Sequence, residues 1–166
     1  MKKYKINEIF YSLQGEGINT GRPAVFIRFS GCNATPDFSC YKFCDTDHSC
    51  KMELTEDEIL KEIKRYPADF VVLTGGEPTL QVDKDIVNKL FFNGYYLAIE
   101  TNGSNIVNND KRYECITVSP KNTDFKQRKG TELKLVYTGK ENLDDYLKDT
   151  CFKPISKSIF NFIIFK

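Results

Sequence analysis

The stretch from Gly31 to Asp47 contains three of the six cysteines in the chain, Cys32, Cys40 and Cys44. Cysteine sulfur is the soft ligand that iron–sulfur clusters and zinc prefer, so three thiolates on one loop can bind a single inorganic centre. A 4Fe–4S cluster normally takes four cysteines, and a loop with three would leave one iron open for a small molecule. The stretch therefore predicts a metal centre with an open coordination position.

Zinc is the alternative metal. His48 is the only histidine, follows Cys44 by four residues, and would complete a Cys₃His set with the three cysteines. The remaining cysteines belong to no motif and are interpreted as ordinary thiols. Uneven cysteine spacing, together with an N-terminus that lacks an apolar secretion signal, favours ligand cysteines in a reducing, cytoplasmic compartment over three disulfides.

Length and charge limit the classes of function. The 166 residues predict one domain with a sizeable core. The net charge of +1 gives no strong field for nucleic acid or an anionic membrane, and we expect neither as a partner. No apolar run has the length that crosses a membrane.

Apolar runs that alternate with helical patterns position these residues. Helices are expected from the capping box Thr55–Glu58 onward, over 82–92 and over 142–147. Strands are expected at 6–13, 24–29, 70–73, 95–99, 116–118, 133–137 and 151–155. Because a polar cluster directly follows most of these strands, the pattern predicts an α/β fold: an open or partial parallel barrel of about six strands, with the clusters on one rim.

Two of these polar positions have two interpretations each. The turn Gly15-Glu16-Gly17 brings the backbone close to another group, or is a hairpin turn with a polar side chain. Arg28, inside an apolar strand, is either an edge residue facing water or an anion binder in a cleft.

Five motifs occur in one order: LQGEG, a cysteine loop that ends in CDT, TGGEP, ETNG and SPK. Together they resemble the 7-carboxy-7-deazaguanine synthase family of radical S-adenosylmethionine enzymes, from Ile6 to Ser156. The resemblance implies one radical S-adenosylmethionine domain over 1–166, with 156–166 as an atypical tail. It also implies a lyase reaction of queuosine and 7-deazapurine biosynthesis. There, a 5′-deoxyadenosyl radical starts the conversion of 6-carboxy-5,6,7,8-tetrahydropterin to 7-carboxy-7-deazaguanine, with loss of ammonia.

The resemblance also implies the site residues. Cys32, Cys40 and Cys44 would bind a 4Fe–4S cluster, and Thr46 would bind Mg²⁺. Glu16 would meet the guanidine-like edge of the pterin, and Arg28 its carboxylate. The full substrate set is Leu13, Gln14, Gly15, Glu16, Arg28, Thr74, Lys153, Pro154, Ile155 and Ser156. The S-adenosylmethionine set is Phe43, Asp45, Gly75, Gly76, Glu77, Glu100, Asn102, Ser119, Pro120 and Lys121. An electron donor such as flavodoxin and a homodimer are implied as well.

Two features depart from the family pattern. The cysteine spacing is C-x7-C-x3-C, where the superfamily has C-x3-C-x2-C. After Ser156 the chain has SKSIFNFIIFK, which resembles no family element and predicts a truncated end that leaves apolar sheet surface uncovered. The alternatives are therefore a degenerate, non-catalytic cofactor-binding relative and another radical enzyme, such as a glycyl-radical activase.

Overall fold

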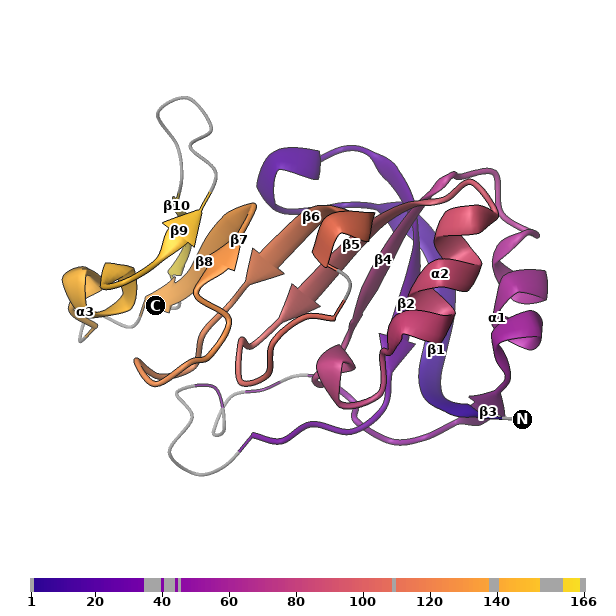
Figure 1. Cartoon of the computed structure of the whole chain (residues 1–166), viewed down its shortest axis with the longest axis horizontal. Helices are drawn as coiled ribbons and strands as arrows, with labels where there is room; N and C mark the ends of the chain where they lie inside the picture. Colours follow the sequence, from indigo (N-terminus) through magenta and orange to yellow (C-terminus); the bar gives the residue numbers. More distant parts are fainter. Residues whose placement is uncertain are drawn as a thin grey trace.

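The computed structural model describes residues 2–34, 40, 44, 46–108, 110–137, 141–152 and 160–164. Its main element is a sheet of eight strands in the order β10-β8-β6-β5-β4-β2-β1-β3 (Figure 1). The bounds are β1 Tyr4–Leu13, β2 Pro23–Phe29, β3 Met52–Leu54, β4 Phe70–Gly75, β5 Tyr96–Thr101, β6 Tyr113–Val118, β8 Glu132–Tyr137 and β10 Phe160–Ile164. Each adjacent pair from β2 through β4, β5, β6 and β8 to β10 is parallel, which confirms the predicted parallel α/β sheet.

Two amphipathic helices cover one face of the sheet (Figure 1). Helix α1 spans Glu56–Ile63 and begins at the predicted capping box, in which Thr55 and Glu58 each bond the other's backbone N–H. Helix α2 spans Lys84–Phe92 and is capped by the Asp83 carboxylate. A short helix, α3, spans Leu143–Leu147, and three 3₁₀ turns lie at Gly17–Asn19 (η1), Pro78–Leu80 (η2) and Asp110–Arg112 (η3).

Strand alternation divides the buried side chains between the two faces, because successive side chains point to opposite sides of a strand. In β4, Val71 and Leu73 join the core under the helices, whereas Phe70 and Val72 join a smaller apolar cluster on the opposite face. Burying each such side chain contributes about 1.5–3 kcal/mol. In β2, Phe26 belongs to that second cluster, so the next residue on the same face, Arg28, is directed away from the helices.

The orientation of β1 differs from the prediction. It pairs antiparallel with both β2 and β3, so the loop after β1 leaves the sheet at the end opposite to the loops after the parallel strands. The expectation that every polar cluster follows a parallel strand on one rim is therefore wrong for LQGEG. The physical reason is the short connection between β1 and β2, which allows only an antiparallel pair.

The C-terminal part also differs. The strand expected over 151–155 is wrong as a member of the main sheet, because β9 (Cys151–Phe152) pairs with β7 (Lys129–Gly130) in a separate two-stranded sheet. The edge beside β8 is taken by β10, from the segment expected to leave that edge uncovered. Over the described ranges, no helix is long and apolar enough to cross a membrane.

Candidate functional site

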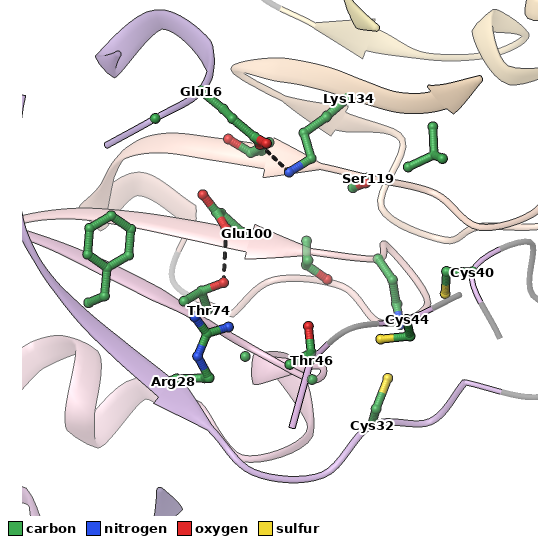
Figure 2. Close-up of a pocket in the computed structure, with 18 of the residues that line it drawn as sticks. Glu16, Arg28, Cys32, Cys40, Cys44, Thr46, Thr74, Glu100, Ser119 and Lys134 are labelled. Carbon is green, nitrogen blue, oxygen red and sulfur yellow. Dashed lines mark hydrogen bonds and ion pairs between the residues drawn. The ribbon is translucent and has the colours of Figure 1, made fainter. Parts of the chain in front are cut away.

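A cavity of about 580 Å³ lies on the face of the sheet opposite the helices and extends from the loop after β1 to the cysteine loop at the C-terminal ends of the parallel strands (Figure 2). This volume suits a small molecule together with a cofactor. The walls come from the loop after β1, the cysteine loop after β2, and the ends of β4, β5, β6 and β8. Of the residues predicted for the site, the cavity is lined by Leu13, Gln14, Gly15, Glu16, Arg28, Cys32, Cys40, Cys44, Thr46, Thr74, Gly75, Gly76, Glu100, Asn102, Ser119 and Lys121.

The cysteine loop contributes three free thiols to one side of this cavity. The base of the loop is closed by a hydrogen bond from the Gly31 N–H to the His48 carbonyl oxygen at 3.0 Å. Burial raises the pKa of the Cys32 and Cys40 thiols. In the metal-free protein both are therefore protonated at neutral pH, and binding a metal displaces their protons.

The placement of the three thiols fits the needs of a cluster. Among the described residues, no three His, Cys, Asp or Glu side chains converge on one point as a zinc site requires, although Cys44 Sγ lies 3.5 Å from His48 Nε2. An iron–sulfur cube presents a separate iron to each thiolate, so its ligands stand apart around a larger object. Three cysteines on one cavity wall meet that requirement.

The TGGEP segment begins with the last two residues of β4, Thr74 and Gly75, and packs against the end of β2 and the start of the cysteine loop. A side chain on Gly76 would lie 2.0 Å from the Gly31 carbonyl oxygen, and one on Gly75 would lie 2.2 Å from the Phe29 oxygen. The paired glycines are therefore required by the close contact of the TGGEP segment with Phe29, the last residue of β2, and with Gly31 of the cysteine loop. This contact holds the backbone at Gly75 and Gly76 beside the cysteines, on the cavity wall.

Glu77 was predicted to contact the cofactor, but it does not line the cavity. It is fully buried, and its carboxylate accepts hydrogen bonds from Thr101 Oγ1 and the Asn102 N–H, both at 2.7 Å. Thr79 donates to the same carboxylate through its N–H at 3.1 Å. Glu77 thus connects the TGGEP segment to the ETNG segment from inside the fold. Pro120 is also buried and does not line the cavity.

A closed ring of three hydrogen bonds joins the cysteine loop to the ETNG segment. Asn102 donates to Asn33 at 2.9 Å, Asn33 donates to the Ser104 hydroxyl at 2.7 Å, and the Ser104 N–H donates to Asn102 at 2.9 Å. Asn33 directly follows Cys32, so this ring orients the first predicted ligand relative to β5.

On the other side of the cavity, acidic and basic groups alternate (Figure 2). The Glu100 carboxylate accepts from Gln14 Nε2 and from Thr74 Oγ1, both at 2.9 Å. Arg28 donates through Nε to Glu8 at 2.6 Å, and no other described residue bonds its terminal nitrogens, which can therefore face a ligand. Such a mixture can bind a molecule that carries both a carboxylate and a guanidine-like edge.

Lysines complete the charge pattern. Lys134 on β8 forms an ion pair with Glu16 at 2.5 Å. Lys121 is half-buried beside the cysteines and donates to Ser119 Oγ at 2.8 Å, and partial burial lowers the pKa of its ammonium group. Thr46 lies on the same side of the cavity as the cysteines (Figure 2), where its hydroxyl is a hard oxygen donor.

Some predicted residues lie outside the described ranges: Phe43, Asp45, Lys153, Pro154, Ile155 and Ser156. Other cavity residues were not assigned to the site from the sequence. They are Phe10, Ser12, Phe26, Ala34, Thr101, Thr117, Lys134 and Val136, with His48 considered only as a zinc ligand. The sequence signal that could have placed Lys134 and Val136 together is strand alternation, because residues two apart in β8 share one face of the sheet.

No family model matches the chain, but known proteins are similar to it. The 7-carboxy-7-deazaguanine synthase of Bacteroides thetaiotaomicron is 48% identical over 138 residues, covering 82% of this chain and 72% of the relative. The enzyme of the same name from Burkholderia multivorans is 41% identical over 164 residues, covering 87% and 77%. The crystal structure of QueE from Escherichia coli matches with a TM-score of 0.67 at 28% identity, covering 86% of this chain and 73% of that one.

Proposed function

The chain belongs to the 7-carboxy-7-deazaguanine synthase family, and we propose that it converts 6-carboxy-5,6,7,8-tetrahydropterin to 7-carboxy-7-deazaguanine with loss of ammonia. It is a lyase of 7-deazapurine biosynthesis in the radical S-adenosylmethionine group. The observation that carries the proposal for this chain's own site is that two groups of residues line one cavity. It is lined by three cysteines on one side and by Glu16, Arg28 and Glu100 on the other.

The cysteine side would hold the cofactors. A 4Fe–4S cluster with S-adenosylmethionine supplies, when bound, the 5′-deoxyadenosyl radical that starts the rearrangement. Cys32, Cys40 and Cys44 would hold the cluster. The Gly75-Gly76 backbone, Asn102, Ser119 and Lys121 line the cavity and would contact S-adenosylmethionine. Glu77 would act indirectly, because its carboxylate already bonds Thr101 and Asn102.

The opposite side would bind the pterin. Arg28 would take the substrate carboxylate with its terminal nitrogens, since Glu8 holds Nε and fixes the plane of the guanidinium. Glu16 would accept hydrogen bonds from the guanidine-like edge of the ring. We assign Glu100 to the same edge, although the resemblance assigned it to S-adenosylmethionine, because its carboxylate bonds Gln14 and Thr74. Gln14 and Thr74 orient Glu100 for this purpose.

Further partners are proposed from the family resemblance. Thr46 would supply an oxygen ligand to Mg²⁺, supported by its place in the cavity. An external one-electron donor such as flavodoxin would reduce the cluster. The enzyme would act as a homodimer in the cytoplasm. No observation favours a glycyl-radical activase.

The test is turnover by anaerobically reconstituted protein given reductant, S-adenosylmethionine and the carboxy-tetrahydropterin, with the product measured by mass spectrometry. Wild-type protein should hold about four irons and form product. Cys44→Ser should lose the cluster and the product. Cys50→Ser is the matched control, because Cys50 is also exposed but does not line the cavity, and it should match wild type.

Three results would count against the proposal. Cluster-loaded wild type that binds S-adenosylmethionine without forming product would instead indicate a non-catalytic relative. Stoichiometric zinc in place of iron would indicate the Cys₃His alternative. A Cys44→Ser protein with full iron content would show that Cys44 is not a ligand of the cluster.

A further inference from the structure

Strand β8 begins with Glu132, a carboxylate that the sequence did not single out. Its side chain is buried and does not line the cavity. Oε2 accepts a hydrogen bond from the Ile18 N–H at 3.1 Å, and Oε1 accepts one from Thr117 Oγ1 at 2.7 Å. One buried acidic group thus bonds both the cavity-facing strand β6 and the turn that follows LQGEG.

The second glycine of LQGEG fits against this carboxylate. Gly17 has φ of +71°, and a side chain there would lie 2.3 Å from Glu132 Oε1. By contrast, a side chain on Gly15 or Gly21 would meet nothing within 4 Å. The group that the backbone approaches at Gly17 is therefore a side chain of this chain, and Glu132 occupies the space that a Cβ would need.

The position of β8 in the sheet shows how far the LQGEG turn extends. The LQGEG turn starts from β1, and β2, β4, β5 and β6 lie between β1 and β8 in the sheet. The turn must therefore cross the cavity face to reach Glu132. Lys134 lies two residues farther along β8, on the same face, and pairs with Glu16 (Figure 2). Two side chains of β8 thus hold consecutive parts of the turn.

We propose that Glu132 is a positioning residue for substrate binding. It fixes the turn at Gly17 and Ile18, so that Gln14 and Glu16 face the cavity from the side opposite the cysteines. The inference rests on the proposed function only insofar as Gln14 and Glu16 bind the pterin. The anchoring itself is a property of the metal-free chain and can be tested without turnover.

The first readout is hydrogen exchange of peptides that cover 14–22 in the metal-free protein. Glu132→Ala should speed exchange at Ile18 and its neighbours and leave β4 and α2 unchanged. Glu132→Gln keeps an acceptor oxygen for the Ile18 N–H and should restore most of the protection. Gly17→Ala should also speed hydrogen exchange in the peptides that cover 14–22. Gly21→Ala is its control, because Gly21 has φ of +85° but open space around it.

The second readout is steady-state kinetics of reconstituted enzyme. Glu132→Ala should raise the KM for the pterin about tenfold, the factor expected for loss of one hydrogen bond to a charged acceptor. Its kcat should change less, and its affinity for S-adenosylmethionine should stay at the wild-type value. In the Glu132→Ala background, Gly17→Ala should raise the KM for the pterin no more than Gly21→Ala does, because the carboxylate that a side chain at 17 would overlap is gone.

The outcomes separate this inference from the proposed function. Wild-type enzyme without turnover would overturn the proposed function, and the exchange experiment would still decide whether Glu132 anchors the turn. Unchanged exchange at 14–22 in Glu132→Ala would overturn the anchoring. Faster exchange with an unchanged KM would overturn the role in substrate binding. Equal effects of Gly17→Ala and Gly21→Ala on exchange would overturn the assigned contact.

Discussion

Replacing Glu77 by alanine should destabilise the metal-free protein by about 4 kcal/mol. The variant leaves two buried donors, Thr101 Oγ1 and the Asn102 N–H, without their 2.7 Å acceptors. Each unsatisfied buried donor costs about 1–3 kcal/mol. For a chain of this size, about 4 kcal/mol corresponds to a fall in Tm of about 10 °C. Urea unfolding and thermal melting of the metal-free protein, followed by circular dichroism, measure both quantities.

A matched control separates this effect from the loss of any carboxylate. Glu53 is exposed on β3, and Glu53→Ala should change the free energy of unfolding by less than about 0.5 kcal/mol. The refuting result is a metal-free Glu77→Ala protein within about 1 kcal/mol of wild type that no longer binds S-adenosylmethionine once reconstituted. That result would show that Glu77 contacts the cofactor directly, as the motif resemblance implied.

Other predictions concern binding, helix stability and thiol reactivity. Arg28→Lys should raise the KM for the pterin about tenfold, because lysine can neither bind a carboxylate through two parallel hydrogen bonds nor make the Nε contact to Glu8. An unchanged KM would show that Arg28 does not bind the substrate. Thr55→Ala breaks the capping box of α1 and should cost about 1 kcal/mol in urea unfolding, with a fall in Tm of about 2–4 °C; equal stability would show that the cap contributes nothing. Burial raises the pKa of the Cys32 thiol, whereas an ordinary thiol has a pKa of about 8.5. In the metal-free protein, the rate at which iodoacetamide alkylates Cys32 should therefore still increase with pH at values above about 9. Mass spectrometry of the Cys32 peptide measures that rate, and a plateau below about pH 8.5 would contradict the raised pKa.

Local patterns in the sequence predicted local structure well. The Thr55–Glu58 capping box, the apolar face of α1 and the existence of strands β2, β4, β5, β6 and β8 all depend on residues close together in the chain. The order of motifs also identified most of the cavity wall. The loops that follow parallel strands meet at one edge of the sheet, whereas LQGEG follows the antiparallel β1 and was identified by the resemblance.

Pairing between distant segments could not be predicted in the same way. Alternation in 6–13 indicates a strand but does not say which neighbour it takes, although the short connection from Leu13 to Pro23 already favoured an antiparallel pair. Similarly, the apolar run at 151–155 has strand character, yet Cys151–Phe152 pairs with Lys129–Gly130. Glu132 and Lys134 were missed because their partners, Ile18 and Glu16, lie more than a hundred residues earlier.

The separation of 114 residues between Ile18 and Glu132 has a consequence for how the molecule is assembled. During synthesis, the glycine-containing turn emerges early and has no anchor until the strand that starts at Glu132 has been made and has joined the sheet. A contact between such distant segments requires closure of a long loop, which is slow compared with forming a helix or a hairpin. The compartment for the reactants is thus completed near the end of folding, after the scaffold beneath it.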